Sequence, residues 1–576
     1  MVGIVLLLVF VGFGCWLGVR GYEAKSSLEQ ARRSAQQAKD ALLKGKAGDA
    51  SRWANDARSQ AQAARDATHS LPWTIAAGVP WLGSPFRSGQ QIADVVLGLA
   101  ADVLRPSADV GAAISPDRLL AGGHLDVQLL RGEEPALSKI SADATRLDAD
   151  AKVIADPKFV SLLRDARTEL QKQTSEIAKL LQNTALAARV APSLMGADGP
   201  RTYFMGFQTN AEARGTGGLL GGFGILRLDN GVPVVDKLAE NTELDKSFTP
   251  LDLGPEYADQ YGFANTTTDY RNSNLSPHFP FVAQIWKSMW AQQTGMNVDG
   301  VIAIDPVALS YVLGAVGPVT MPDGEVITKD NVVELTESTA YIRFPLATDQ
   351  PARKKYLQDI AQEVVKKITG PVQSPRDLLD ALGKAVSEGR IAVWSASPAD
   401  QKLLEETPLA HVVPDDAGPY AAVVINNLGG NKLDYYLKRN IEYAADNCDG
   451  KTRNSTVTVE LTSTVPAGLP DWLAGTAGLP QIPKVPSGTM VTSVRLLATH
   501  GARLVSALAD GQRVPVFAGT ERGHPVFEVQ VAISPGKSGR LAFHLSEPTA
   551  PGTPRVPIQP LVDTVTPVVS VPTCAG

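Results

Sequence analysis

The sequence predicts a multidomain α+β protein. We expect an N-terminal transmembrane helix, an α-helical stalk or bundle, a central α/β domain with a mixed sheet, and a C-terminal antiparallel β-sandwich. Three observations predict this order. The chain carries no charged side chain before Arg20, helical alanine and leucine spacing fills most of its first third, and short strand patterns begin after Pro200. A length of 576 residues has room for such an arrangement, since domains usually take about 100 to 200 residues each.

Composition places the chain among ordinary globular proteins. Hydrophobic residues make up 44% of the sequence and charged residues 20%, which is too apolar for a disordered chain. The 54 Lys and Arg residues face 60 Asp and Glu residues, and the formal net charge is -6. Because nucleic-acid binding needs a basic surface, DNA and RNA are excluded as expected partners.

Residues 1–20 form the first predicted element, a membrane anchor. The run MVGIVLLLVFVGFGCWLGV is uncharged, and at about 1.5 Å per residue it matches the roughly 30 Å of a bilayer core. A cleaved signal peptide would have a basic start and a shorter apolar run. A lipoprotein signal at Cys15 is the other alternative, but the apolar run continues through Trp16 and Leu17. We therefore expect a single-pass anchor and the cell membrane as a partner.

The orientation of this anchor is not given by charge, because only the terminal amine precedes the run. Cys448 and Cys574 are the two cysteines outside it. An even pair suits one disulfide bond in an oxidising compartment, although two buried free thiols are the alternative. This pair favours a location at the cell membrane with the bulk of the chain outside the cytoplasm.

Residues 21–195 are predicted to be helical. Alanine and leucine recur every three or four residues on both sides of a Gly-rich break at 44–49, which indicates two helices joined by a turn. Such a pair is either a stalk that binds a partner or a plain bundle. The segment at 70–86, SLPWTIAAGVPWLGSPF, holds two tryptophans, which are typical either of a membrane interface or of a core.

The rest of the chain contains the predicted strands. Over residues 200–389, runs such as RTYFMGFQTN, GFGILRLDNG, VDGVIAIDP and TAYIRF read as strands between helices, which predicts an α/β layer domain. Over residues 396–576, short alternating runs are separated by Gly, Pro and Asp. That pattern predicts an antiparallel β-sandwich.

Several kinds of site can be set aside. The sequence has no HExxH pair, no cysteine pair with zinc spacing and no GxSxG nucleophile turn. The glycines from Gly215 to Gly224 do not have dinucleotide-binding spacing. They either bring backbone close to a phosphate or make a tight turn.

Polar residues of the α/β range are the remaining candidates. Arginine donates two hydrogen bonds in one plane and so suits phosphate recognition, whereas a surface ion pair is the alternative for each single arginine. The candidates lie in three places. These are the glycine run with the residues just before it, the segment TTDYRNSN, and the stretch from the end of the predicted strand TAYIRF to the start of the following helix. They are Asn210, Glu212, Arg214, Gly217, Gly218, Asp269, Arg271, Asn274, Arg343 and Arg353.

The order of these segments carries a resemblance. NAEARGTGG, TTDYRNSN, VDGVIAIDPVALSYVLGAVGPV and YIRF followed by Arg353 resemble, distantly and over about residues 200 to 370, the LytR-CpsA-Psr family of envelope phosphotransferases. With NNLGGNKLDYYLKR at 426–439, the whole chain looks more like an actinobacterial group of membrane-anchored proteins known as a domain of unknown function. No activity follows from the second resemblance.

The first resemblance implies a specific chemistry. Such proteins move a glycopolymer from a polyprenyl-pyrophosphate carrier to peptidoglycan, with arginines on the pyrophosphate and carboxylates on Mg²⁺. It implies Arg214, Arg271, Arg343 and Arg353 as pyrophosphate clamps, and Glu212 or Asp269 as metal ligand or base. The sequence departs from the family pattern, because the glycine run holds no second carboxylate and Arg343 is not doubled.

Three functions are therefore expected. The first is a membrane-anchored glycopolymer phosphotransferase of the cell envelope. The second is a non-catalytic envelope scaffold or glycopolymer-binding protein, which contacts other envelope proteins. The third is a hydrolase of lipid-carrier pyrophosphate, which would use the same arginines with water as the acceptor.

Overall fold

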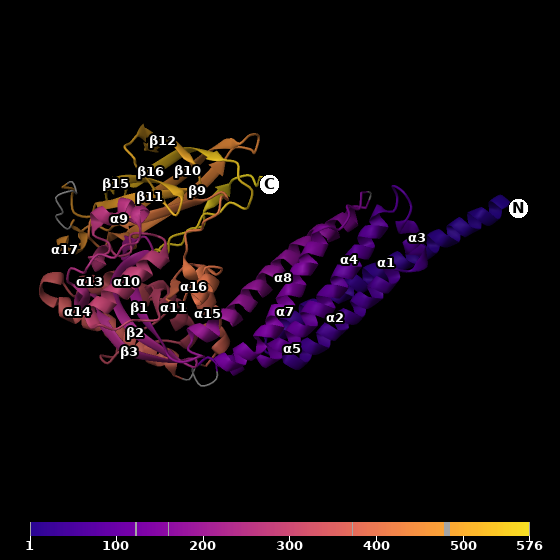
Figure 1. Ribbon diagram of the computed structural model, residues 1–576, viewed down its shortest axis with the longest axis horizontal. Helices are drawn as coiled ribbons and strands as arrows, with labels where there is room; N and C mark the ends of the chain where they lie inside the picture. The colour runs from indigo at the N-terminus through magenta and orange to yellow at the C-terminus, as the bar shows by residue number, and fades with distance from the viewer. Residues whose placement is uncertain (1, 121–123, 159, 371–372, 477–483, 575–576) are drawn as a thin grey trace. The chain divides into compact units, whose positions relative to one another are not determined.

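The computed structural model describes residues 2–120, 124–158, 160–370, 373–476 and 484–574. The side chains of residues 2–16, 43 and 346–348 also lie outside the described part. Contacts divide the chain into two compact units, Met1–Asp198 and Gly199–Gly576. Each unit is described by itself (Figure 1).

The first unit is a helical bundle with an alanine core. A short turn at 44–46 joins α1 to α2. The Gly-rich break in the sequence predicts this turn. Buried alanines such as Ala38, Ala54 and Ala61 let these helices approach closely, because alanine adds no bulk between the two backbones. The helices are α1 (Val2–Leu43), α2 (Ala47–Thr68), α3 (Leu71–Ala77), α4 (Ser84–Gly98), the π-helix η1 (Leu99–Leu104), α5 (Arg105–Ala113), α6 (Pro116–Leu119), α7 (Val127–Lys152) and α8 (Ser161–Leu194).

The expected transmembrane helix is not supported, and this part of the predicted fold class is wrong. No helix within the described ranges has both the length and the apolar character needed to cross a bilayer. Helix α1 does not end after the apolar run but continues to Leu43, and its described side chains from Arg20 onward include charged residues in every turn or two. Met1 and the side chains of residues 2–16, which make up most of the predicted anchor, lie outside the described residues.

The second unit begins with a five-stranded mixed sheet in the order β3-β2-β1-β4-β7. Strands β1 (Arg201–Arg214) and β4 (Gly300–Ile304) are parallel, whereas β2 (Gly217–Asp229), β3 (Val232–Glu240) and β7 (Ile391–Ser395) join antiparallel. One face carries an aromatic core in which Phe204 stacks on Phe223 and contacts Trp286.

Helices surround this sheet and account for most of the residues between its strands. Those before β7 are η3 (Asn241–Leu244), α9 (Pro255–Tyr261), η4 (Gly262–Ala264), η5 (Tyr270–Asn272), α10 (Phe279–Thr294), α11 (Pro306–Val316), α12 (Val332–Glu334), the π-helix η6 (Leu335–Thr339), α13 (Ala340–Arg343), α14 (Leu346–Thr369) and α15 (Pro375–Ser387). A two-stranded ribbon of β5 (Val319–Thr320) and β6 (Val326–Ile327) precedes α12.

Two details of the α/β prediction need correction. The segment TAYIRF is helical, in η6 and α13, although its β-branched and aromatic residues favour a strand. The buried positions of these two helices do not alternate as in a strand. They are Leu335, Glu337, Ser338, Ala340 and Tyr341. Strand β7 also lies beyond the predicted limit of the domain at 389, since it pairs with β4.

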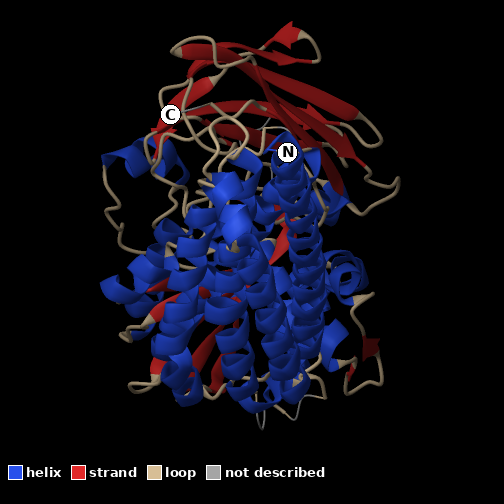
Figure 2. Ribbon diagram, turned by 90° about the vertical axis from the view of Figure 1, so that its right-hand side faces the viewer, coloured by secondary structure: helices blue, strands red, loops and turns tan. Residues whose placement is uncertain are grey.

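A β-sandwich follows, with its strands forming the red group at the top of Figure 2. Its sheets have the orders β13-β12-β16-β10-β9-β17 and β14-β15-β11-β8, and between them lies a core of residues such as Val423, Tyr443 and Phe543. A disulfide bond joins Cys448 to Cys574. The strands are β8 (Ala421–Asn427), β9 (Leu437–Ala445), β10 (Thr452–Ser463), β11 (Met490–Ala498), β12 (Arg503–Ala509), β13 (Gln512–Arg513), β14 (Phe517–Glu521), β15 (His524–Ile533), β16 (Ser538–Pro548) and β17 (Val568–Ser570).

Further short helices lie before the sandwich or between its strands. They are α16 (Pro398–Leu404), η7 (Pro408–Ala410), η8 (Leu433–Tyr436) and α17 (Asp471–Ala474). Of these, η8 contributes side chains to the site described next.

Candidate functional site at the carboxyl end of β1

The end of β1 lies at a special place in the sheet. β1 pairs with the parallel strand β4 only as far as Phe207, opposite Ile304, and continues alone on that side to Arg214. Residues 210–212 have no partners on β2 either, because the register shifts between Thr209 and Ala213. Ligands of α/β proteins bind beyond the carboxyl ends of parallel strands, so this bulged end is the candidate site.

Glu212, predicted as a metal ligand or base, and Arg214, predicted as a pyrophosphate clamp, bind each other in the interior. Arg214 Nη2 lies 2.7 Å from Glu212 Oε1, and Lys432 Nζ contacts the other carboxylate oxygen. Burial raises the pKa of Glu212, but Lys432 and Arg214 outweigh it and lower the pKa below its usual value. Burial likewise opposes the charge on Lys432, yet Glu212 raises its pKa overall. The three groups form a closed ionic triad.

The remaining donors of Arg214 are also used. Its guanidinium donates to the carbonyl oxygens of Arg271 at 3.0 Å, Ala213 at 2.9 Å and Asn427 at 3.3 Å. Arg214 therefore ties β1 to η5 and to β8 of the sandwich. It has the partners of a structural arginine rather than of a free phosphate clamp.

Gly217 and Gly218, predicted to contact substrate, serve a close approach of backbone. A Cβ atom at Gly218 would lie 2.1 Å from the carbonyl oxygen of Thr209, and Gly217 has a φ of +132°. Gly215 meets the carbonyl oxygen of Leu275 in the same way, at 2.2 Å. The glycines thus make a tight β1–β2 turn against neighbouring backbone, which is one of the two expected roles.

Asn210 and Asn274 are fully buried amides of the same region. Asn210 Nδ2 donates to the carbonyl oxygen of Pro560 at 2.9 Å. Asn274 Nδ2 donates to the carbonyl oxygen of Gly218 at 2.7 Å and to Thr216 Oγ1 at 3.0 Å. Both side chains hold the bulge in place.

The other predicted residues lie in separate ion pairs. Arg271 pairs with Asp269 at 3.2 Å and with Asp245, and all three are at least partly exposed. Arg343 binds Glu325 through two hydrogen bonds of 2.9 Å, well away in sequence from the β1 turn. Three of the four predicted arginines, Arg214, Arg271 and Arg343, are therefore already paired with carboxylates of the chain.

Arg353 differs from the others, because it has no carboxylate partner among the described residues. Its side chain is 7% exposed, its guanidinium lies 4.9 Å from the centre of the Tyr341 ring, and Nη1 donates to the Phe344 carbonyl oxygen at 3.4 Å. Burial lowers its pKa, and only Tyr341 acts in the opposite direction.

Two carboxylates that sequence reasoning missed complete the site. Glu337 Oε2 accepts hydrogen bonds from the Ala211 amide at 2.6 Å and from Thr209 Oγ1 at 2.9 Å. Asp434 Oδ2 accepts from the Ala213 amide at 2.8 Å. Ala211 lies in the stretch of β1 that is unpaired with β2, and Ala213 lies beyond the end of the pairing with β4, so the two carboxylates satisfy amides that strand pairing leaves open.

Both missed carboxylates have raised pKa values. Glu337 is 1% exposed, and burial raises its pKa to about 7 despite the hydrogen bond from Ala211. Burial raises the pKa of Asp434 to about 6. Glu337 also lies on the π-helix η6, a kind of irregularity that is frequent at functional sites. A carboxyl group that titrates near neutral pH can act as a general acid or base.

Signals for these residues were present in the sequence. Glu337 is the one acidic residue between Thr336 and Phe344. Lys432 and Asp434 lie in the segment NNLGGNKLDYYLKR. What the sequence does not reveal is that these segments fold against the end of β1.

The C-terminal segment closes the site from another side. Gln559 Nε2 donates to the carbonyl oxygens of Arg214 at 2.6 Å and Ile425 at 2.8 Å. Arg390 donates to the Leu561 carbonyl oxygen at 2.6 Å and to Asp305 at 3.0 Å. Residues 559–561 thus occupy the region beyond the ends of β1 and β4.

Aromatic side chains lie beside the buried charges. Trp472, which is 47% exposed, places its Nε1 3.4 Å from the Tyr341 carbonyl oxygen. Tyr436 Oη lies 3.0 Å from Ser338 Oγ, and the Tyr435 and Tyr436 rings meet edge to face at 4.9 Å. We call Tyr435, Tyr436 and Trp472 the aromatic group.

The predicted magnesium ligands do not fit that ion as they stand. Both oxygens of Glu212 contact the cations Arg214 and Lys432, and both oxygens of Asp269 face Arg271. Throughout the described ranges, no three His, Cys, Asp or Glu side chains gather as a group able to hold a metal ion. No step is assigned to magnesium here.

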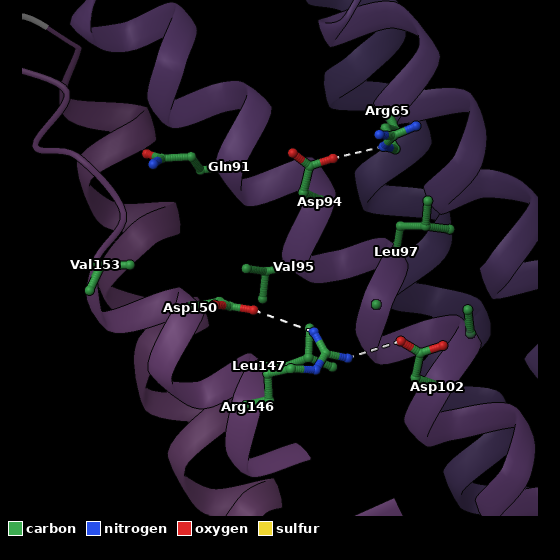
Figure 3. A pocket seen from close by; sticks show the side chains of 12 residues that line it. Arg65, Gln91, Asp94, Val95, Leu97, Asp102, Arg146, Leu147, Asp150 and Val153 are labelled. Atoms are coloured by element: carbon green, nitrogen blue, oxygen red, sulfur yellow. Dashed lines mark hydrogen bonds and ion pairs between the residues drawn. The ribbon is translucent and has the colours of Figure 1, made fainter. Parts of the chain in front are cut away.

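A cavity of about 570 Å³ lies in the first unit, among α2, α4, η1 and α7. Figure 3 shows that its charged side chains point toward one another, with Arg65 paired to Asp94 at 2.7 Å and Arg146 between Asp102 and Asp150. Each of these three aspartates is already paired with an arginine, so the charged side chains of the pocket bind one another rather than a ligand.

Comparison with curated proteins and with solved structures finds no match to the chain. A family model does match residues 198–341, which contain Thr209, Glu212, Arg214, Glu337 and Tyr341 but neither Lys432 nor Asp434. Neither an actinobacterial origin nor a relation to the LytR-CpsA-Psr family follows from this match. The expected likeness to a family of unknown function is confirmed for that range: residues 198–341 match the family described as "Protein of unknown function (DUF4012)".

Proposed function

We propose that this protein binds a glycopolymer of the cell envelope without transferring it, as an extracytoplasmic binding and scaffold protein. The observation that carries the proposal is the aromatic group, which is at least partly exposed. Two of its members are held beside Glu337, because Tyr436 bonds to Ser338 of η6 and Trp472 to the Tyr341 carbonyl oxygen of α13. Flat aromatic faces with a polar edge suit sugar rings, which have apolar C–H faces and polar hydroxyl rims.

The commitments of the arginines favour binding over transfer. Phosphoryl transfer depends on free cations that converge on one phosphate. Arg214, Arg271 and Arg343 instead pair with Glu212, Asp269 and Glu325. The segment 559–561 also takes up the position beyond β1 and β4 where a phosphate would sit. The disulfide between Cys448 and Cys574 supports the extracytoplasmic part of the proposal, because such bonds persist in oxidising compartments.

The experiment is a titration of the full chain with two purified glycopolymers, neutral arabinogalactan and sugar-substituted polyglycerol phosphate, followed by calorimetry. We expect Trp472→Ala to weaken polysaccharide binding at least about tenfold, as for other exposed aromatic anchors. Trp81→Ala, which removes another exposed tryptophan in the first unit, is the matched control and should bind normally. Equal affinity of the Trp472→Ala and unmodified proteins would overturn the proposal, as would the absence of binding to either polymer.

A glycopolymer phosphotransferase is the second candidate, and Arg353 is the observation that favours it. A buried cation without a carboxylate partner is costly, and a phosphate oxygen would compensate it. Lys432 lies 5.6 Å from the centre of the same Tyr341 ring, and Glu337 has a pKa of about 7, suited to moving a proton. A lipid-carrier pyrophosphate hydrolase would use the same groups.

Binding of a short-chain polyprenyl pyrophosphate, with and without Mg²⁺, separates the candidates. The transferase and hydrolase require binding that Arg353→Met weakens at least about tenfold, with head-group transfer or release that Glu337→Gln abolishes. Arg343→Met is the control, because Arg343 is already paired with Glu325. Polysaccharide binding without any pyrophosphate binding would leave the glycopolymer-binding proposal standing alone.

A further inference from the structure

The segment from Leu71 to Leu82 presents an apolar surface to solvent. Leu71, Ile75 and Val79 are exposed at spacings of four residues, on one face of α3 and its continuation, and Trp81 and Leu82 follow in the turn before α4. We call these five residues the α3 patch. No charged side chain occurs from Ser70 to Phe86. Contiguous exposed apolar residues of this kind mark an interaction site.

The two tryptophans of this segment have opposite roles. Trp73 is buried, donates from Nε1 to the Phe86 carbonyl oxygen at 2.9 Å, and meets the Phe86 ring edge to face at 5.2 Å. Arg87 Nη1 donates to the Ala77 carbonyl oxygen at 2.8 Å and holds the end of α3. Trp73 and Arg87 therefore hold the segment in a defined conformation, and its exposed side chains belong to folded structure.

Trp81 is held outward at a cost in backbone energy. Its indole is 90% exposed and its φ is +66°, a conformation that is strained for a bulky residue. The turn closes tightly, because a Cβ atom at Gly83 would lie 2.2 Å from the Ala77 carbonyl oxygen. The strained backbone and the exposed indole are both explained if the indole has a binding partner.

The neighbouring part of α1 extends the same character. α1 approaches Trp73 at Gly21, where an added Cβ atom would lie 3.6 Å from the indole. Val19 and Tyr22 are exposed nearby, on either side of Arg20 and Gly21, and Arg20 pairs with Glu23. The sequence from Val2 to Val19 has no charged side chain. Val19 and Tyr22 thus add exposed apolar surface to that of the α3 patch.

We propose that the α3 patch docks on the surface of a lipid bilayer, with Trp81 and Leu82 in the interfacial layer. Tryptophan and tyrosine prefer the headgroup level of a membrane, where an apolar ring and a polar N–H or O–H are both satisfied. Leu71, Ile75 and Val79 supply the apolar face that an interfacial helix buries. A bilayer also accommodates an exposed apolar patch without a matching shape, which a protein partner would have to provide.

The test uses the full chain and vesicles of phosphatidylethanolamine and phosphatidylglycerol. Flotation should be reduced at least about fivefold by Ile75→Ser/Trp81→Ser/Leu82→Ser, since each change removes apolar area from the contact. The control is Leu180→Ser/Phe263→Ser/Val505→Ser, three similarly exposed apolar residues elsewhere, which should float like the unmodified chain.

Hydrogen exchange keeps the test decisive if other parts of the chain also bind lipid. With vesicles, the backbone amides of 71–82 should exchange more slowly, whereas those around Phe263 should not change. Unaltered exchange at 71–82 together with unaltered flotation of the triple variant would overturn the proposal. Protection that depends on protein concentration and appears without vesicles would identify a second copy of the chain as the partner instead, and would also overturn it.

Discussion

The two units place their charges in opposite ways. In the helical unit the interior is alanine together with aliphatic side chains such as Leu147, and ion pairs such as Arg65–Asp94 lie on the surface. In the second unit several pairs are inside, among them Arg214–Glu212 and Arg439–Asp563. Breaking an ion pair should therefore change the free energy of unfolding by different amounts in the two units. A charge on the surface remains hydrated without its partner, whereas a buried charge does not. Substitutions can measure this difference, beginning with the largest effect.

Removing one partner of a buried pair should have the largest effect. Asp563→Ala leaves the fully buried Arg439 guanidinium without its carboxylate and should lower the free energy of unfolding of the second unit by about 3–5 kcal/mol. Urea unfolding, followed by hydrogen exchange of peptides from each unit, measures it. In Arg439→Met/Asp563→Leu much of the loss should return, and a double variant as unstable as the single one would contradict this account.

Glu337 should make the second unit less stable as the pH rises. Its folded pKa of about 7 lies above the ordinary value of 4.5, so the folded state retains a proton that the unfolded chain has lost. The contribution of Glu337 to the free energy of unfolding is complete below about pH 4.5 and is lost as the pH rises through 7. For Glu337 alone this loss is roughly 3 kcal/mol.

Urea midpoints at pH 5 and pH 8 test this dependence. Glu337→Gln keeps the acceptor for Ala211 and Thr209 without a titrating proton, so its unfolding free energy should fall less between the two pH values. Asp434, with a pKa of about 6, contributes a remaining slope in the same direction. An identical pH dependence in the variant would show that Glu337 is not the titrating group.

Overpacking the alanine interior of the helical unit should have an intermediate effect. Ala61→Leu places three more carbon atoms between α2 and its neighbours and should cost about 1–3 kcal/mol. Ala63→Leu, on the exposed side of the same helix, should change the free energy by less than about 0.5 kcal/mol. The comparison is made by hydrogen exchange within α2, and equal effects at the two positions would mean that α2 does not pack through this face.

The surface pair should have the smallest effect. A double-mutant cycle of Arg65→Ala and Asp94→Ala should give a coupling energy of about 0.2–1 kcal/mol, which 1 M salt should reduce further. A coupling as large as that of Arg439 and Asp563 would remove the contrast between the two units.

The fold could be predicted from the sequence where the pattern is local. The alanine spacing and the Gly-rich break give α1 and α2, and alternating apolar residues give β1, β4 and most sandwich strands. TAYIRF could not be assigned this way, because its residue types favour a strand while its packing is helical.

The site was predicted only in part, because its contacts join distant segments. Glu212 and Arg214 do lie at the bulged end of β1, but an arginine pattern does not tell which carboxylate each guanidinium will meet. Glu337 is 126 residues from Ala211, and Asp434 is 221 residues from Ala213. No periodicity within either segment indicates that the two meet.

The hydrogen bond from Asn210 to Pro560 spans 350 residues. The end of β1 therefore cannot reach its final state until almost the whole chain has been synthesised, whereas the helical unit has all its residues available once residue 198 has emerged. Contacts this distant in sequence form slowly, because a long loop must close before any hydrogen bond is gained. During this interval the free amides of the bulge and the charged residues beside it are exposed to solvent and to folding factors, so maturation of the second unit, rather than of the bundle, should limit the rate at which functional protein accumulates.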